Sequence, residues 1–144
     1  MIKNVSRSLI VDVTVERAYE IWSDFARFPL LLRDVEQVRV EGRRLRWLVR
    51  REEWEVLITE LTPNQRVSWH GLEGPRLHAV VSMSPTDDRR TKVTLGAEYE
   101  VLPGEPDDKG ARYEQILLVF KDHAEAMSSP GHAKRAGAIR TARE

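Results

Sequence analysis

The chain of 144 residues contains no cysteine. Disulfides, thiolate nucleophiles and cysteine-based zinc or iron–sulfur sites are therefore excluded, and a cytoplasmic setting is expected. The first residues lack the uninterrupted apolar core of a signal peptide, so export is not expected. No apolar run approaches the roughly 20 residues that cross a bilayer, so stable membrane insertion is not expected either.

Net charge is absent as well, because 23 Lys and Arg balance 23 Asp and Glu. Without an overall field the chain is not expected to bind nucleic acid or an anionic membrane. One stretch, Arg43 to Arg51, is locally basic, and we interpret it as the solvated side of a strand rather than an anion site.

Several common chemical signatures are missing. No His or carboxylate pair shows metal-ligand spacing, so no metal site is expected. His70 and His78 are expected to face outward. The nucleophile elbow and the phosphate-binding glycine loop are absent too, which argues against the usual hydrolases and nucleotide-binding enzymes. We therefore expect no cofactor.

The first third of the chain indicates a strand followed by two short helices. Residues 5–13 are rich in β-branched side chains, and Thr14 is suited to cap a helix over residues 15–22 with one apolar face. Asp24 is expected to cap a second short helical segment. Pro29 either ends that segment or begins another turn.

From there on the apolar period changes from 3.6 to 2. Six strands are predicted, at 35–41, 44–50, 53–61, 66–71, 76–84 and 91–102. Short turns make neighbouring strands antiparallel. A long helix is expected to begin near Asp107 and Asp108 and to lie on the sheet. Its apolar stripe consists of Tyr113, Ile116, Leu117, Phe120, Ala124 and Met127. We expect one domain over residues 1–127 and a mobile tail over 128–144.

Three segments carry a resemblance to a known family. They are VSRSLIVDVTVERAYEIWSDFARFP (Val5–Pro29), ITELTPNQRVSWHG (Ile58–Gly71) and TKVTLGAEYEVLPG (Thr91–Gly104), supported by Trp54. In this order and spacing they resemble the START-like helix-grip (SRPBCC) superfamily and its polyketide cyclase/dehydrase branch. The resemblance implies an α+β helix-grip fold. In that fold a curved antiparallel sheet of about seven strands wraps around a long C-terminal helix, with two short helices after the first strand.

Strand parity and the helical stripe predict an apolar pocket between the sheet and the last helix. Its predicted lining is Trp47, Trp54, Trp69, Leu77, Met83, Tyr99, Tyr113 and Phe120. Tryptophans bury a large surface and keep a polar N–H, which suits an aromatic or isoprenoid ligand. The competing interpretation is that the same side chains form an ordinary filled core.

Two functions remain open. The first is binding of a hydrophobic small molecule, such as a polyketide, lipid or quinone. The alternative, implied by the resemblance, is a polyketide aromatase/cyclase or dehydrase, with Tyr99, Arg7 and Tyr113 as candidate catalytic residues. For Tyr99 the competing interpretation is a packed ring with its hydroxyl at the rim. A third, weaker interpretation is an interaction module that docks through the sheet. The sequence does not decide between a monomer and a homodimer.

Overall fold

A computed structural model describes residues 2–32, 34–72, 76–104 and 106–128. The elements, in chain order, are β1 (Ile2–Val11), α1 (Val15–Trp22), the 3₁₀ helix η1 (Phe25–Leu30), β2 (Val35–Glu41), β3 (Arg44–Val49), β4 (Glu52–Thr62), β5 (Arg66–Gly71), β6 (Leu77–Pro85), β7 (Thr91–Glu100) and α2 (Lys109–Ser128). The predicted architecture of one antiparallel sheet, two short helices and one long helix is confirmed.

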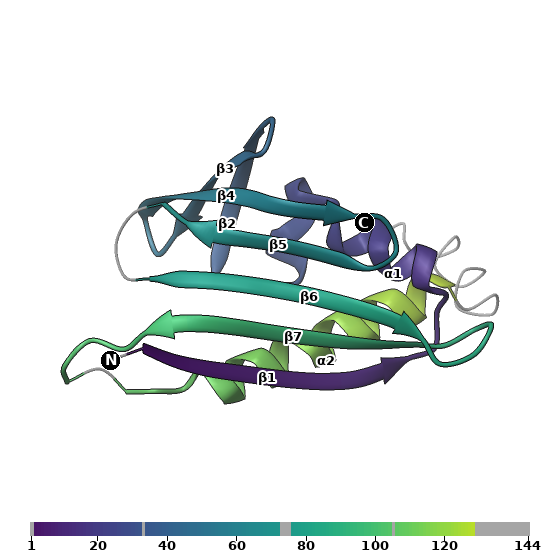
Figure 1. Cartoon of the computed structure of the whole chain (residues 1–144). Coiled ribbons are helices and arrows are strands. Elements are labelled where there is room, and N and C mark those ends of the chain that lie inside the picture. Colours follow the sequence, from purple (N-terminus) through teal and green to yellow (C-terminus); the bar gives the residue numbers. More distant parts are fainter. Residues whose placement is uncertain (1, 33, 73–75, 105, 129–144) are drawn as a thin grey trace.

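The seven strands form one sheet in the order β1-β7-β6-β5-β4-β3-β2. Six strands follow one another as a meander, and β1 returns to pair with β7, from Ile2 opposite Glu100 to Val11 opposite Thr91. The helices lie on one side of this curved sheet (Figure 1). The interior therefore lies between the sheet and α2, with α1 and η1 at its flank.

The N-terminal elements show where local signals were sufficient. Thr14 caps α1 as predicted, because its hydroxyl accepts a bond from the Arg17 N–H at 3.2 Å. The prediction that Asp24 caps the next segment was wrong in mechanism, since its side chain makes no capping bond. That segment is a 3₁₀ helix with Pro29 inside it. Strand β1 lies nearer the N-terminus than the predicted 5–13, because its length is set by pairing with β7.

The turn between β3 and β4 is conformationally strained. Arg50 and Arg51 both have left-handed backbones, with φ of 51° and 71°. A two-residue hairpin turn of this hand normally uses Asn-Gly, because side chains disfavour positive φ. The β2–β3 hairpin avoids this cost by placing Gly42 at φ 65°. The β3–β4 turn therefore folds against its local preference.

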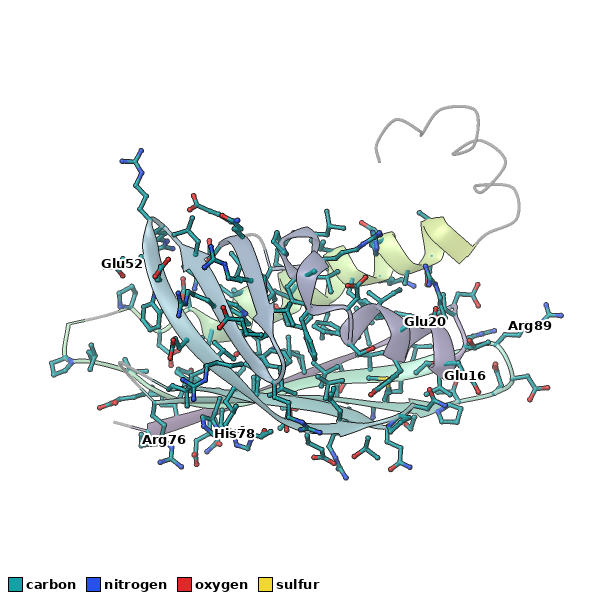
Figure 2. All side chains as sticks on the ribbon, turned by 90° about the horizontal axis from the view of Figure 1, so that it is seen from above. Glu16, Glu20, Glu52, Arg76, His78 and Arg89 are labelled. Atoms are coloured by element: carbon teal, nitrogen blue, oxygen red, sulfur yellow. The ribbon has the colours of Figure 1, made fainter. Side chains whose placement is uncertain are left out.

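The outer side of the sheet is polar. His70 and His78 lie opposite each other there, with ring centroids 6.4 Å apart, so their predicted outward direction is confirmed. Figure 2 shows His78 on the side of the sheet away from α2. The interpretation of the basic stretch as a strand face holds only for Arg44 and Arg46, which lie on β3 and pair with Glu55 at 3.3 Å each, whereas Arg43, Arg50 and Arg51 lie in turns.

The predicted tail falls almost entirely outside the described residues, which end at Ser128. The side chain of Met127, assigned to the helical stripe, is likewise outside them. Within the described part of the chain, no helix combines the length and the apolar character needed to cross a bilayer.

Candidate ligand-binding site

An aromatic cluster occupies the middle of the interior. Phe28, carried by η1, has ring-centroid distances of 6.1 Å to Trp47, 5.6 Å to Trp69 and 6.2 Å to Trp22. Sequence reasoning did not single out Phe28 as an interior residue. A signal was present, because Trp22, Phe25 and Phe28 recur every third residue, the spacing that aligns side chains on a 3₁₀ helix.

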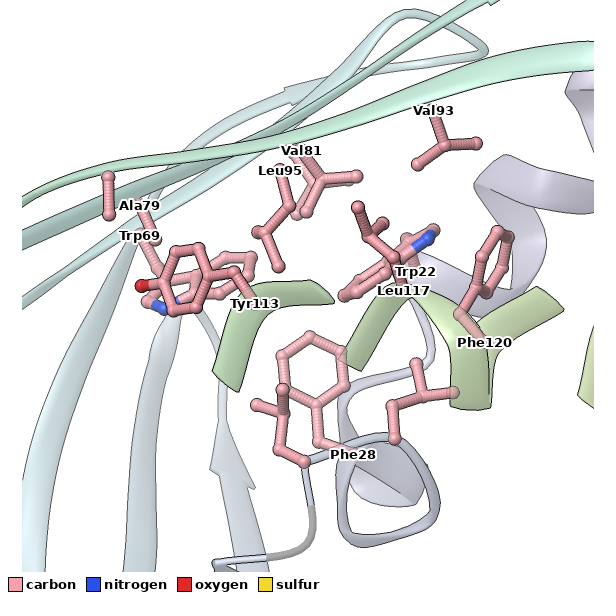
Figure 3. Packing of buried hydrophobic residues seen from close by; sticks show 14 of the residues in the cluster. Trp22, Phe28, Trp69, Ala79, Val81, Val93, Leu95, Tyr113, Leu117 and Phe120 are labelled. Carbon is pink, nitrogen blue, oxygen red and sulfur yellow. The ribbon is translucent and has the colours of Figure 1, made fainter. Parts of the chain in front are cut away.

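One end of the interior, which we call the closed end, is fully packed. Trp22, Val93 and Phe120 are each 0% exposed, and the Trp22 and Phe120 rings lie 5.2 Å apart. Figure 3 shows these three side chains gathered on the α1 side of the cluster. Phe120 and Met83, both predicted to line a pocket, are buried within the core. The closed end has the packing of an ordinary core.

The opposite end, which we call the open end, lies beneath the β3–β4 turn and beside the start of α2. Its side chains are those of Trp47, Trp54, Trp69, Leu77, Tyr99 and Tyr113, which belong to the buried cluster or pack against it. Trp54 and Leu77 are only partly buried. Trp54 lies opposite Trp47, and Leu77 lies opposite Tyr99, so each pair faces the same side of the sheet. Six of the eight predicted lining residues are thus brought together here.

Three tryptophan N–H groups are buried without a hydrogen-bond partner among the described residues. They belong to Trp22, Trp47 and Trp54. Buried donors are nearly always paired in proteins, because an unpaired one costs about 1–3 kcal/mol. Two of the three lie at the open end.

A polar group borders the open end. The Tyr99 hydroxyl donates to Asp107 Oδ1 at 2.6 Å, and Lys3 Nζ lies 3.2 Å from Asp107 Oδ2. The bond to the carboxylate is the main reason that the Tyr99 pKa is raised to about 12, with burial second. The same bond lowers the pKa of Asp107. Asp107 was expected to cap the long helix, and its carboxylate does accept from the backbone N–H of Lys109, the first residue of α2, in addition to binding Tyr99 and Lys3.

The other two candidate catalytic residues lie close to Tyr99. Burial raises the pKa of Tyr113 to about 12, and Tyr99 adds a smaller electrostatic contribution. Arg7 acts on Tyr99 in the opposite sense and pairs with Glu114 at 3.3 Å. The Arg7 guanidinium also fills the space that a Cβ at Gly110 would need, with Cζ at 3.2 Å. Glycine at the start of α2 therefore lets Arg7 lie against the helix.

Two hollows of the described residues lie outside this interior. One, of about 470 Å³, is a shallow depression around Gly96 on the outer side of the sheet, bordered by His78 and Glu98. The other, of about 220 Å³, lies between α1, η1 and α2 beside His123. Neither hollow includes the aromatic side chains of the open end.

Comparison with known proteins identifies the family. Residues 11–108 match the model of the polyketide cyclase/dehydrase and lipid transport family. The chain belongs to this family. It is also 33% identical over 101 residues to an uncharacterized 17.2 kDa protein of the melC2-rnhH intergenic region of Streptomyces lincolnensis, covering 66% of this chain and 67% of that protein.

Solved structures agree with the family in their fold. A START superfamily protein from Mycobacterium smegmatis superposes with a TM-score of 0.76 at 16% identity, over 87% of this chain and 99% of its own. The Zhui aromatase/cyclase from a Streptomyces species superposes with a TM-score of 0.73 at 16% identity, over 91% and 98%. The helix-grip, START-like fold is thereby confirmed. Membership in the family implies that the chain binds a hydrophobic ligand.

Proposed function

We propose that the protein binds a hydrophobic small molecule of polyketide, lipid or quinone type at the open end of the interior. The proposal rests on a contrast between the two ends of the interior in how completely their side chains are buried. At the closed end the side chains of Trp22, Val93 and Phe120 are sealed from water. At the open end Trp54 and Leu77 stay partly exposed beside buried donors that lack acceptors.

The energetics of side-chain burial favour ligand binding at the open end over binding at the closed end. Fully burying a large apolar side chain stabilises a protein by about 1.5–3 kcal/mol, and the open end leaves part of this unrealised. A ligand that covers the exposed parts of Trp54 and Leu77 would gain that stabilisation. Displacing Trp22 or Phe120 instead would open a fully packed core, which is costly.

The proposal is tested with Nile red, a neutral dye that fluoresces in apolar sites. Saturable binding to the wild-type protein is expected. Leu77→Gln places an amide in the open end and should weaken binding about tenfold, because burying an unpaired polar group costs about 1–3 kcal/mol in proteins. Ile10→Gln is the matched control, since Ile10 is 48% exposed on β1 and should leave binding unchanged.

Two results would contradict the proposal. One is a dye signal that does not saturate, which would mean that no defined site exists. The other is equal weakening by the two glutamine variants, which would place the dye elsewhere on the protein. Circular dichroism of each variant shows that the fold is retained.

A second candidate function, polyketide cyclase or dehydrase chemistry, is favoured by the arrangement of Arg7, Tyr99 and Tyr113 beside the open end. Both phenols stay protonated at neutral pH and can donate to a developing enolate. The Tyr99 proton, however, is directed at Asp107. If Tyr99 acts as the acid, Tyr99→Phe should lower turnover of a poly-β-ketone substrate by about 100-fold or more. Full activity of that variant would remove Tyr99 from the mechanism.

A further inference from the structure

Two buried indole N–H groups at the open end point to the chemistry of the ligand. Trp47 and Trp54 lie directly opposite each other on β3 and β4. Nε1 of each is shielded from solvent and has no acceptor among the described residues. Trp47 is only 8% exposed. Packing alone gives no reason to place two unpaired donors opposite each other.

The contacts of the Trp47 ring are with aromatic side chains. The Trp47 ring has Phe28 at 6.1 Å and Trp69 at 6.3 Å, measured between ring centroids. An indole N–H can only donate, so it is satisfied only by an acceptor atom. A hydrocarbon ligand would leave both donors unpaired. A ligand with a carbonyl-type oxygen would pair with one or both.

We infer that the open end selects apolar molecules that carry a carbonyl-type acceptor oxygen, and that the N–H groups of Trp47 and Trp54 are the donors that recognise it. This inference rests on the proposed function and narrows it to a ligand class. Trp22 serves as an internal contrast. Its N–H is also buried and unpartnered, but the residue is fully enclosed at the closed end, against Phe120.

Fluorenone and fluorene provide a matched pair of probes, because they share one tricyclic skeleton and differ by a carbonyl in place of a methylene. Kd for each probe is measured by quenching of tryptophan emission in the wild type and in Trp47→Phe, Trp54→Phe and Trp22→Phe. The quantity compared is the ratio of the two Kd values in each protein. The probes differ in water solubility by the same amount in every protein, and the smaller ring of phenylalanine affects both probes in a variant. Both effects therefore largely cancel when the ratios are compared between proteins.

The preference for fluorenone should fall about 2–10-fold in Trp47→Phe or Trp54→Phe, the worth of one hydrogen bond. In Trp22→Phe it should stay at the wild-type value. If Trp47→Phe does not fold, Trp54→Phe carries the test, because its side chain is only partly buried.

Three outcomes would overturn the inference. An equal ratio in all four proteins would overturn it while leaving hydrophobic binding intact. A loss in Trp22→Phe as large as in the other variants would show that the effect is not local to the open end. Failure of the wild type to bind either probe would overturn the inference and the proposed function together.

Discussion

The two ends of the interior are built from the same kinds of side chain and yet differ in how completely these are buried. At the closed end Trp22 and Phe120 pack at 5.2 Å with no exposed surface. At the open end Trp47 and Trp54 are opposite each other on β3 and β4, and Trp54 stays partly exposed. Among the described residues, an N–H without an acceptor occurs at both ends, on Trp22 as well as on Trp47 and Trp54. We infer that the closed-end pair stabilises the fold and that the open-end pair contacts the ligand.

A strained backbone segment is also found at the open end. The strained Arg50–Arg51 turn lies at the open end, at the junction of the two strands that carry the tryptophan pair. Unfavourable backbone conformations persist only where the surrounding structure imposes them, and they cluster at functional sites. The comparison indicates that the fully packed side chains, which stabilise the fold most, lie near α1 and the second half of α2. The partly exposed side chains and the strained turn lie near the start of α2.

The largest expected difference between the ends is in stability. Phe120→Ala should lower the free energy of unfolding by about 3–5 kcal/mol, because a fully buried ring leaves a cavity. Trp54→Ala should cost roughly 1–2 kcal/mol, because its side chain is only partly buried. Urea denaturation measures both. Equal losses would remove the distinction between a packed and an open end.

Alkaline pH should destabilise the protein through ionisation of Tyr99 and Tyr113. Their folded pKa values of about 12 exceed the ordinary tyrosine value of about 10, so the folded state holds these protons more tightly than the unfolded chain. The resulting stability is fully present below pH 10 and is lost as pH rises toward 12. Asp107→Asn should lower the Tyr99 pKa by removing the negative charge, which ultraviolet titration detects. An unchanged titration would show that Asp107 does not hold that proton.

Relief of the strained turn should stabilise the protein. Replacing Arg50 and Arg51 by Asn and Gly is expected to add about 1–2 kcal/mol, because each left-handed non-glycine residue costs about that much. The exposed ion pair of Arg50 with Asp34, at 3.9 Å, contributes little that would be lost. Arg43→Gly, in the turn that already has Gly42, is the control and should destabilise slightly. A drop in melting temperature for the double variant would contradict the claim that this turn destabilises the protein.

The smallest expected effect is the pH response of His123, beside the hollow between α1 and α2. Burial, and then the charges of Arg17 and Arg27, lower its pKa. The unfolded chain therefore takes up a proton more readily, so the contribution of His123 to stability falls as pH drops through about 6.5. His123→Gln should flatten the stability profile between pH 5 and 7. An identical profile would exclude this residue, whose hollow also contains Glu20 and Asp24.

Much of the fold could be predicted from the sequence because period and turn chemistry are local. The bounds of α1 and β2 follow from apolar spacing and flanking residues, and they agree with the structure. The inward direction of Trp47 and Tyr99 followed from strand parity. Trp54 was also placed correctly, although the pairing of β4 with β5 shifts between Ile58 and Glu60, because the shift comes after it.

The site itself could be predicted only in part. Parity shows which side chains point inward, but not how far along the interior they lie, so Met83 and Phe120 were grouped with residues at the opposite end. The bond between Tyr99 and Asp107 depends on how the segment before α2 returns to β7, which no local pattern records. Phe28 was missed because its role depends on the position of η1 against the sheet.

The central claim, that the ligand binds at the open end, is tested most directly by the indole N–H signals of the isotope-labelled protein. The chain has four tryptophans, so four such signals are expected. On titration with fluorenone, the signals of Trp47 and Trp54 should shift and saturate while that of Trp22 stays in place. A shift confined to Trp22, or four unmoved signals at saturating probe, would contradict the account.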